Sequence, residues 1–326
     1  MVAAVAMGAA LAFSMTTWIF AHTPTDLERT SVLLEALENP ELQPEFIAFG
    51  NSVVMSGIDT NVISENLPGN PLGLNLATTG QNPADSYLYY QNLPDSVNLI
   101  LQFTLPRFAI HYDGIEPQKY NAMYMYGYRP NDITRERLSD ILGESTREIL
   151  NRSEFRQRFE SRWSTQQTAD NVIRSIARDD LELDIATYNL YFPNNSAKRL
   201  TEPQMQRALD QRYIRRTNSR YPYKDIKTAL FKEAAIRAEE LDARFALVIS
   251  PMHPSVHGRY TEEWFAIVRD YFGQMGKDGE FAIIDATDAV PEQEFVDALH
   301  VSRAGGKILS EFVANEIMRL NLVAEH

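Results

Sequence analysis

Short apolar runs alternate with stretches of helical periodicity along most of the chain. The compact apolar runs are 46–49, 72–77, 97–103, 245–249 and 281–284. We interpret them as buried strands, because each is short and ends at polar or turn-forming residues. Apolar residues at helical spacing occupy intervals between them, at 84–92, 225–241, 262–275 and 304–320.

Strands that alternate with amphipathic helices form parallel sheets joined by right-handed crossovers. The order of elements therefore predicts an α/β fold. In more detail, we expect a three-layer α/β/α sandwich around a parallel, flavodoxin-like sheet. The 326 residues are enough for one large domain, which we place at 45–326.

The interval from about 105 to 223 interrupts this alternation and predicts an insertion or cap over the edge of the sheet. It is polar, rich in Arg and Tyr, and helical in pattern from Asp132 to Ala177. Its arginines are mixed with Glu and Asp, which favours a solvated helix face over a binding surface. Its tyrosines are Tyr112, Tyr120, Tyr124, Tyr126 and Tyr128, beside His111. They are open to two interpretations, stacking on sugar rings or packing of the insertion against the core.

The first twenty residues carry no charge and are apolar throughout. About 20 helical residues span the hydrocarbon core of a bilayer, so residues 1–22 predict a transmembrane anchor. A cleaved signal peptide is the alternative. The absence of Lys or Arg before the apolar run and the poor cleavage site at Phe20-Ala21-His22 count against it. Residues 23–44, with a capping signal at Thr25-Asp26, predict a connecting helix.

Charge and cysteine content exclude several classes of function. The formal net charge is -13 and the pI is about 5.0, so we expect no nucleic-acid partner, because such binding rests on clustered Lys and Arg. The chain has no cysteine. This excludes thiol catalysis, thiolate metal sites and disulfides together.

Ligands of open α/β sheets gather beyond the carboxyl ends of the strands, so the polar residues there are the candidates for chemistry. Gly50-Asn51-Ser52 follows the first strand. Ser52 is either a nucleophile or the N-cap of the next helix. Asp297-Ala298-Leu299-His300 precedes the last helix. A serine nucleophile needs a base and the imidazole of that base needs a carboxylate, and this pair offers both. By itself, the same segment is also consistent with an ordinary surface loop.

Taken together, these segments resemble the SGNH (GDSL-like) hydrolase superfamily. Its first block carries the nucleophilic serine after the first strand, and its last block, Asp-x-x-His, precedes the last helix. The resemblance covers about residues 45–104 and 240–320, and it implies a triad of Ser52, His300 and Asp297. Asn75 to Gly80 is similar to the second block, which implies that the N–H of Gly80 joins that of Ser52 in an oxyanion hole.

The chain departs from the pattern of this family in two places. Asn51 replaces the usual aspartate of the first block, which leaves the nucleophile intact. The third block normally ends in an asparagine that completes the oxyanion hole, whereas this chain has Gln102-Phe103-Thr104. Gln102 or Thr104 could donate in its place.

Variant third blocks and N-terminal membrane segments are also features of SGNH-like proteins that O-acetylate envelope polysaccharides. That resemblance implies serine-dependent O-acyl transfer or ester hydrolysis on an envelope glycan. It also implies a membrane-bound O-acyltransferase or larger membrane assembly as partner, and a single pass through the bacterial inner membrane with the catalytic domain in the periplasm or outside. The alternative is an inactive SGNH-like scaffold, which would have His300 more than about 5 Å from the Ser52 hydroxyl.

No metal or cofactor is expected. His253 and His257 follow the fourth predicted strand, but Pro254 between them argues against one helical face, and no carboxylate pattern completes a metal site. A structural or substrate-lining role fits them better. A flavodoxin-like phosphate site is disfavoured because the Gly50 loop lacks a dense glycine pattern.

Overall fold

A computed structural model describes residues 26–105, 114–153, 156–157, 160, 189–193, 199–213, 225–255 and 262–323. Its sheet is parallel and five-stranded, in the order β2-β1-β3-β4-β5. The strands are β1 (Phe46–Phe49), β2 (Gly73–Asn75), β3 (Leu99–Thr104), β4 (Arg244–Ile249) and β5 (Ala282–Asp285). This is the flavodoxin-like strand order, so the predicted α/β fold with a parallel sheet is confirmed.

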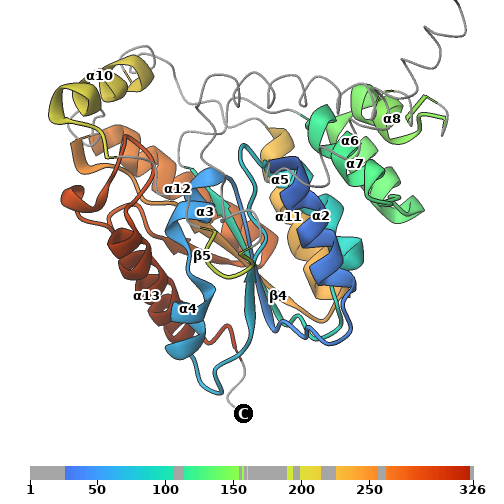
Figure 1. The fold of residues 1–326 in the computed structure, drawn as a ribbon, viewed down its shortest axis with the longest axis horizontal. Helices are drawn as coiled ribbons and strands as arrows, with labels where there is room; N and C mark the ends of the chain where they lie inside the picture. Colours follow the sequence, from blue (N-terminus) through green and yellow to red (C-terminus); the bar gives the residue numbers. More distant parts are fainter. Residues whose placement is uncertain are drawn as a thin grey trace, which may run out of the picture.

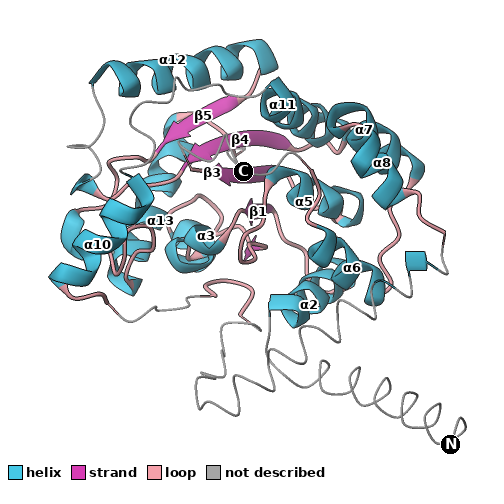
Figure 2. Ribbon diagram, turned by 90° about the horizontal axis from the view of Figure 1, so that it is seen from above, coloured by secondary structure: helices cyan, strands magenta, loops and turns pink. Residues whose placement is uncertain are grey.

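Helices cover both faces of the sheet (Figure 1). One layer consists of α2 (Asp26–Glu38), α5 (Pro83–Leu88), α11 (Asp225–Glu240) and α12 (Glu262–Gly279). The other consists of α3 (Ser52–Gly57), α4 (Thr60–Glu65) and α13 (Arg303–Arg319). The described residues also form two short 3-10 helices, η1 (Tyr89–Asn92), which contributes Tyr89 and Tyr90 to the core, and η5 (Glu292–Glu294), which has no buried residue. Figure 2 shows the same layers from above.

Alternation of side chains along β1 builds two separate cores. Ile47 and Phe49 pack with the layer that contains α2, α5 and α11, whereas Phe46 and Ala48 pack with α3, α4 and α13. All four side chains are fully buried. A strand with both faces covered has no polar position to alternate with, which explains its continuous apolar run.

The described part of the insertion begins with α6 (Pro117–Met125), α7 (Asp132–Leu142) and α8 (Glu144–Leu150), on the α11 side of the molecule. Further on, α10 (Glu202–Tyr213) lies on the other side, where Met205 and Leu209 pack with Phe265 of α12. Gly143, with φ +81, separates α7 from α8 and divides the predicted helical stretch. The part of that stretch beyond residue 160 lies outside the described residues. Tyr120 and Tyr128 are buried in the main core, so these two tyrosines pack the insertion against the domain.

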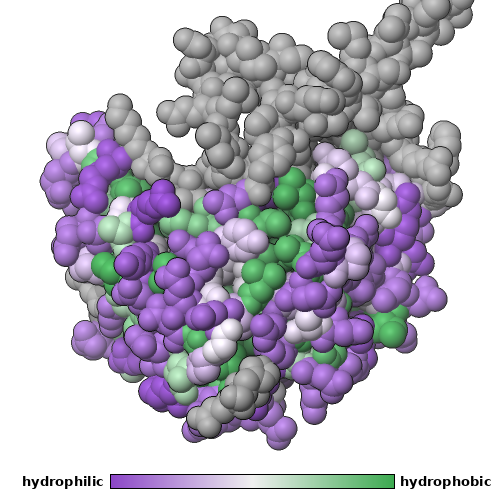
Figure 3. All heavy atoms as spheres, turned by 60° about the horizontal axis from the view of Figure 1, so that its bottom comes forward, coloured by the Kyte–Doolittle hydropathy of each residue, from purple (hydrophilic) through white to green (hydrophobic). Residues whose placement is uncertain are grey.

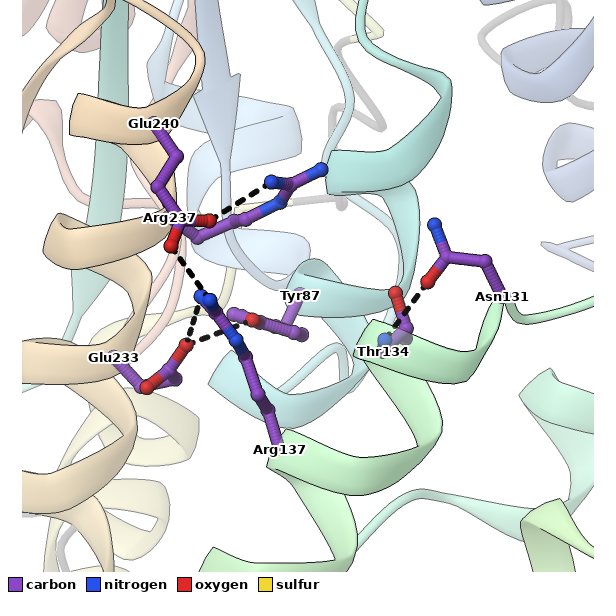
Figure 4. Close-up of polar contacts among 7 residues, drawn as sticks. All are labelled: Tyr87, Asn131, Thr134, Arg137, Glu233, Arg237 and Glu240. Carbon is purple, nitrogen blue, oxygen red and sulfur yellow. Dashed lines mark hydrogen bonds and ion pairs between the residues drawn. The ribbon is translucent and has the colours of Figure 1, made fainter.

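An ion network joins α7 to α11 and α5 (Figure 4). Arg137 on α7 donates to Glu233 at 2.8 Å and to Glu240 at 2.5 Å, and Arg237 pairs with Glu240 at 2.9 Å. The hydroxyl of Tyr87 on α5 donates to Glu233 at 3.0 Å. Because Arg137 is only 27% exposed and its fork contacts two carboxylates, the network fixes α7 against α11.

Residues 189–193 lie beside the carboxyl end of the edge strand β2, an arrangement that the sequence did not predict. The N–H of Asn75 donates to the carbonyl of Leu190 at 2.7 Å, and the N–H of Thr60 donates to that of Tyr191 at 3.1 Å. From the other side, the buried guanidinium of Arg29 donates to the carbonyls of Ala77 and Asn75, each at 2.7 Å. The carboxyl end of β2 is thereby held in place by two distant segments.

The predicted membrane anchor at 1–22 lies outside the described residues, and so does the beginning of the predicted connecting helix. Helix α2 begins at Asp26, within the expected 23–44. Across the described ranges, no helix has both the length and the apolar character needed to cross a bilayer. The underside of the molecule is mostly polar, with apolar residues gathered in a narrow central band (Figure 3).

Candidate active site

Ser52 is the first residue of α3, directly after the turn that ends β1. Asn51 is the N-cap of this helix, and its side chain accepts the N–H of Val53 at 3.0 Å. The alternative that Ser52 is itself the cap is therefore wrong, and its hydroxyl is available for other contacts. A Cβ on Gly50 would come within 2.3 Å of a methyl group of Val54, so the tight turn before Ser52 requires glycine here.

The structure brings Ser52, His300 and Asp297 into one hydrogen-bonded line, although Ser52 and His300 are 248 positions apart. His300 Nε2 lies 2.9 Å from Ser52 Oγ. His300 Nδ1 lies 2.8 Å from Asp297 Oδ2. When Nδ1 carries the proton and donates it to the carboxylate, Nε2 is free to accept the serine proton. This is the arrangement that a serine nucleophile needs.

The backbone around Asp297 fixes the carboxylate for this contact. Its Oδ1 accepts the N–H groups of Leu299 at 2.7 Å and His300 at 2.8 Å, which leaves Oδ2 for the imidazole. Burial alone would raise the pKa of Asp297, but hydrogen bonds from His300 and Leu299 and the neighbouring imidazole lower this pKa to about 2. The N–H of Val296 donates to the carbonyl of His300 at 2.9 Å and closes the loop. The carboxylate stays ionised at neutral pH.

A cavity of about 240 Å³ opens beside Ser52 and His300. Its polar lining comes from Asn51, Ser52, Thr79, Gly80, Gln81, Asn82, Thr104 and His300. Its apolar lining includes Val53, Leu105 and Leu299, which form a small buried cluster of their own. The reacting groups thus face a space with one apolar side and several hydrogen-bonding groups, which is typical of a small-molecule site.

The backbone N–H groups of Ser52 and Gly80 lie at this cavity, and neither forms a hydrogen bond within the described part of the chain. Gly80 is the third residue of a four-residue turn closed by the N–H of Gln81 on the carbonyl of Thr78 at 3.2 Å. Its φ of +67 suits glycine at that position. Unpaired donors at the edge of a cavity are able to stabilise an oxyanion.

The two residues considered as replacements for the missing third-block asparagine differ in position. Thr104, at the end of β3, lines the cavity. Gln102 does not, and its amide donates to the carbonyl of Phe103 at 3.1 Å. Both residues lie on the same face of β3 as Ile100, but Thr104 is at the carboxyl end of the strand, whereas Gln102 lies two residues further inside the sheet and is only 2% exposed. Thr104 remains a candidate donor, whereas Gln102 does not reach the cavity.

His253 lies buried behind the Asp297 loop and not in the cavity. Its ring centroid is 5.0 Å from that of Phe295, and its Nδ1 accepts the N–H of Ser255 at 3.2 Å. Burial lowers its pKa, which favours a neutral ring in the loop packing. His257 lies outside the described residues. No group of acidic residues and histidines within the described ranges could hold a metal ion.

Lys119 and Asp85 lie next to this site and were not singled out from the sequence. Lys119 Nζ donates to Thr78 Oγ1 at 2.6 Å, and Asp85 accepts the N–H of Asn82 at 3.1 Å. Asn82 and Asp85 form a capping box at the start of α5, a signature visible in the sequence as Asn-Pro-Ala-Asp. Lys119 left no such signal, because its partner is 41 positions away.

Comparisons with known proteins give a distant likeness. No model of a known protein family matches the chain, and no curated protein matches it. Among solved structures, a protein whose name proposes it as an arylesterase, from Agrobacterium tumefaciens str. C58, aligns at 9% identity and a TM-score of 0.35. The alignment covers 86% of this chain and 100% of that one. The function proposed below therefore rests on the geometry of the site.

Proposed function

We propose that this chain is a serine-dependent ester hydrolase or acyltransferase in which Ser52 attacks, His300 transfers protons and Asp297 orients the imidazole. One observation carries the proposal: the continuous contact from Ser52 Oγ to His300 Nε2 at 2.9 Å and from Nδ1 to Asp297 at 2.8 Å. Each group is placed by its own local structure, so the line does not depend on one flexible side chain.

In the first half of the reaction, Ser52 Oγ attacks the ester carbonyl and its proton moves to His300 Nε2. The negative charge that develops on the carbonyl oxygen is met by the N–H groups of Ser52 and Gly80, with the hydroxyl of Thr104 as a further donor. When the C–O bond breaks, Nε2 returns the proton to the leaving alkoxide. The acyl group remains on Ser52 as an ester.

In the second half, His300 takes a proton from an acceptor hydroxyl, and that oxygen attacks the acyl ester. The tetrahedral intermediate collapses, and Nε2 gives the proton back to Ser52 Oγ. Water as acceptor makes the chain an esterase, and a sugar hydroxyl makes it a transferase. The same three residues serve both reactions.

The size of the cavity favours a small acyl group, because about 240 Å³ is at the low end for a ligand site. We further propose O-acetyl transfer on an envelope glycan, with a membrane-bound O-acyltransferase as partner and tethering at the bacterial inner membrane. This finer proposal is supported by the uncharged apolar segment at residues 1–22 and by the family resemblance of the motifs.

An inactive scaffold is the competing proposal, and the site geometry counts against it. Such a scaffold has no need to keep the three groups aligned, and a separation above about 5 Å between imidazole and hydroxyl would favour it. The distance of 2.9 Å is that of a formed hydrogen bond.

The test is covalent labelling of the full-length chain with a fluorophosphonate, followed by mass spectrometry of the labelled peptide. We expect the label on Ser52, and turnover of small acetyl esters that is lost in both Ser52→Ala and His300→Ala. Ser31→Ala, which removes a serine of α2 whose hydroxyl donates to Glu35 at the surface, serves as the matched control. A wild-type chain that takes no label and turns over no ester would exclude the enzyme and favour the scaffold.

A further inference from the structure

A chain of polar contacts links the insertion to the turn that carries Gly80. Lys119 Nζ, on α6, donates to Thr78 Oγ1 at 2.6 Å. The hydroxyl of Thr78 donates onward to Gln81 Oε1 at 3.1 Å, and the amide of Gln81 donates to Ser86 Oγ at 3.1 Å. Thr78, Gln81 and Ser86 are buried. Because a buried polar chain is costly to leave incomplete, the contacts define one arrangement of this turn.

Further hydrogen bonds join the residues just before α6 to the start of α5. The carboxylate of Asp85 accepts the N–H of Glu116 at 2.9 Å and that of Asn82 at 3.1 Å. The side chain of Asn82 donates to the carbonyl of Gly114 at 3.2 Å. Asp85 is 1% exposed, and the charge of Lys119 offsets part of the cost of burying its carboxylate. Residues 114–119 are thus joined to the turn through Thr78 and to the start of α5 through Asn82 and Asp85.

The turn that carries Gly80 is also bonded to the loop that precedes Ser52. The N–H of Thr78 donates both to the carbonyl of Gly50 at 3.2 Å and to Gln81 Oε1 at 2.8 Å. Gly80 itself has no such support, since no atom lies within 4 Å of the place where its Cβ would be. The direction of its N–H follows from the geometry of the turn, which Thr78 and Gln81 close.

We propose that Lys119 is a positioning residue for acyl transfer, which acts through Thr78 to hold the Gly80 N–H toward the reacting carbonyl. This inference rests on the proposed function, because it assigns a role within the same site. It gives the insertion a part in catalysis: α6 supplies the contact that orders one side of the oxyanion hole. Because the oxyanion hole lacks the usual asparagine, fewer donors share the charge, and the placement of the Gly80 N–H matters more.

The experiment compares Lys119→Met, which keeps the aliphatic stem, with Lys119→Arg, which keeps the charge and the donors. Thr78→Val and Thr78→Ser form a second pair that removes and retains the hydroxyl. The double variant Lys119→Met with Thr78→Val tests whether the two act as one unit. Lys232→Met is the matched control. Lys232 is also partly exposed, but it lies on α11 near the first residues of β4 and β5, at the end of the sheet opposite the candidate active site.

Three readouts are measured on the full-length chain: kcat and KM for a small acetyl ester, the rate of fluorophosphonate labelling of Ser52, and the thermal unfolding midpoint. We expect Lys119→Met and Thr78→Val each to lower kcat and the labelling rate about tenfold or more, with KM within about threefold, because misplacing a group by about 1 Å can cost a hundredfold. Lys119→Arg and Thr78→Ser should restore most of the rate, and the double variant should be no slower than either single one.

The outcomes separate the two proposals. If the wild-type chain is labelled and turns over ester while Lys119→Met keeps full kcat, the positioning role is overturned and the proposed function stands. A loss of kcat that Lys119→Arg does not restore and that follows the unfolding midpoint also overturns it, since that pattern marks a structural residue. If the wild-type chain is neither labelled nor active, both proposals are overturned.

Discussion

The change Asp297→Asn tests the electrostatics and the tautomer of the site at once. The amide oxygen can still accept the N–H groups of Leu299 and His300, as Oδ1 does now at 2.7 and 2.8 Å. The amide nitrogen, however, takes the place of Oδ2 and presents hydrogen to Nδ1 of His300. The ring then carries its proton on Nε2 and cannot accept the proton of Ser52. We expect kcat to fall on the order of 10³ to 10⁴, as for the loss of a triad aspartate.

The same change has a stability component whose size follows from the pKa. The pKa of Asp297 falls from 3.8 to about 2 on folding, which at about 1.36 kcal/mol for each pH unit corresponds to roughly 2 kcal/mol. The side chain is 25% exposed, so solvent screens this only in part. Because the pKa in the folded chain is depressed, the stabilisation is fully present above pH 3.8 and is lost as the pH falls toward 2.

Urea unfolding of both proteins, measured from pH 7 to pH 3, tests this sign. We expect the wild-type chain to be more stable than Asp297→Asn by roughly 2 kcal/mol at pH 7, and the difference to shrink as the pH drops below about 4. A difference that is constant over the whole range, or that grows toward low pH, would refute the electrostatic account. A variant with kcat within threefold of wild type would refute the role assigned to the carboxylate.

Three further predictions concern the surroundings of the site. Gly50→Ala places a Cβ within 2.3 Å of a neighbouring methyl group, and we expect a loss of about 1 to 3 kcal/mol in urea unfolding together with lower esterase activity. Burial is the main reason that the pKa of Asp85 is raised to about 6, so ionisation of this carboxyl group destabilises the folded state as the pH rises from about 4 to 6. The free energy of unfolding of Asp85→Asn should therefore rise relative to that of the wild type over that range. Arg137→Met leaves Glu233 without its ion pair and should cost about 1 to 2 kcal/mol in thermal or urea unfolding, whereas Arg319→Met, at a 62% exposed pair, should leave stability nearly unchanged.

Each of these has a contrary result. Wild-type stability and activity in Gly50→Ala would mean that the turn before Ser52 has room for a side chain. A stability difference for Asp85→Asn that does not depend on pH would show that folding does not raise the pKa of this carboxyl group. Equal effects of the changes at Arg137 and Arg319 would show that the network in Figure 4 behaves as an exposed surface pair.

The sequence predicts the central sheet well and its surroundings less well. The limits of β1 agree with the predicted 46–49, because a strand buried on both faces is apolar from end to end. The 84–92 segment, by contrast, divides into α5 and the 3-10 helix η1, a tightening of the last turn that apolar spacing does not reveal. Residues 189–193 reach β2 through a backbone hydrogen bond to Asn75, which no local pattern in the sequence specifies.

The site shows the same division. Ser52, Asp297 and His300 each follow a strand or precede a helix, so parallel topology predicts that they meet at one edge of the sheet. Gln102 does not line the cavity because it lies two residues before the carboxyl end of β3, where its side chain is buried and donates to the carbonyl of Phe103. Lys119 was missed because its contact depends on how the insertion folds back, which no local pattern specifies.

The separation of 248 positions between the serine and the histidine also affects how activity arises during synthesis. A chain that has emerged only as far as β4 holds its serine on the finished turn, yet has no base to activate it. The base arrives just before α13, the last helix, which packs against α3 and α4 through side chains such as Leu309 and Val313. Under the proposed function, turnover requires His300 to reach Ser52, so the onset of turnover reports the docking of α13 against α3 and α4.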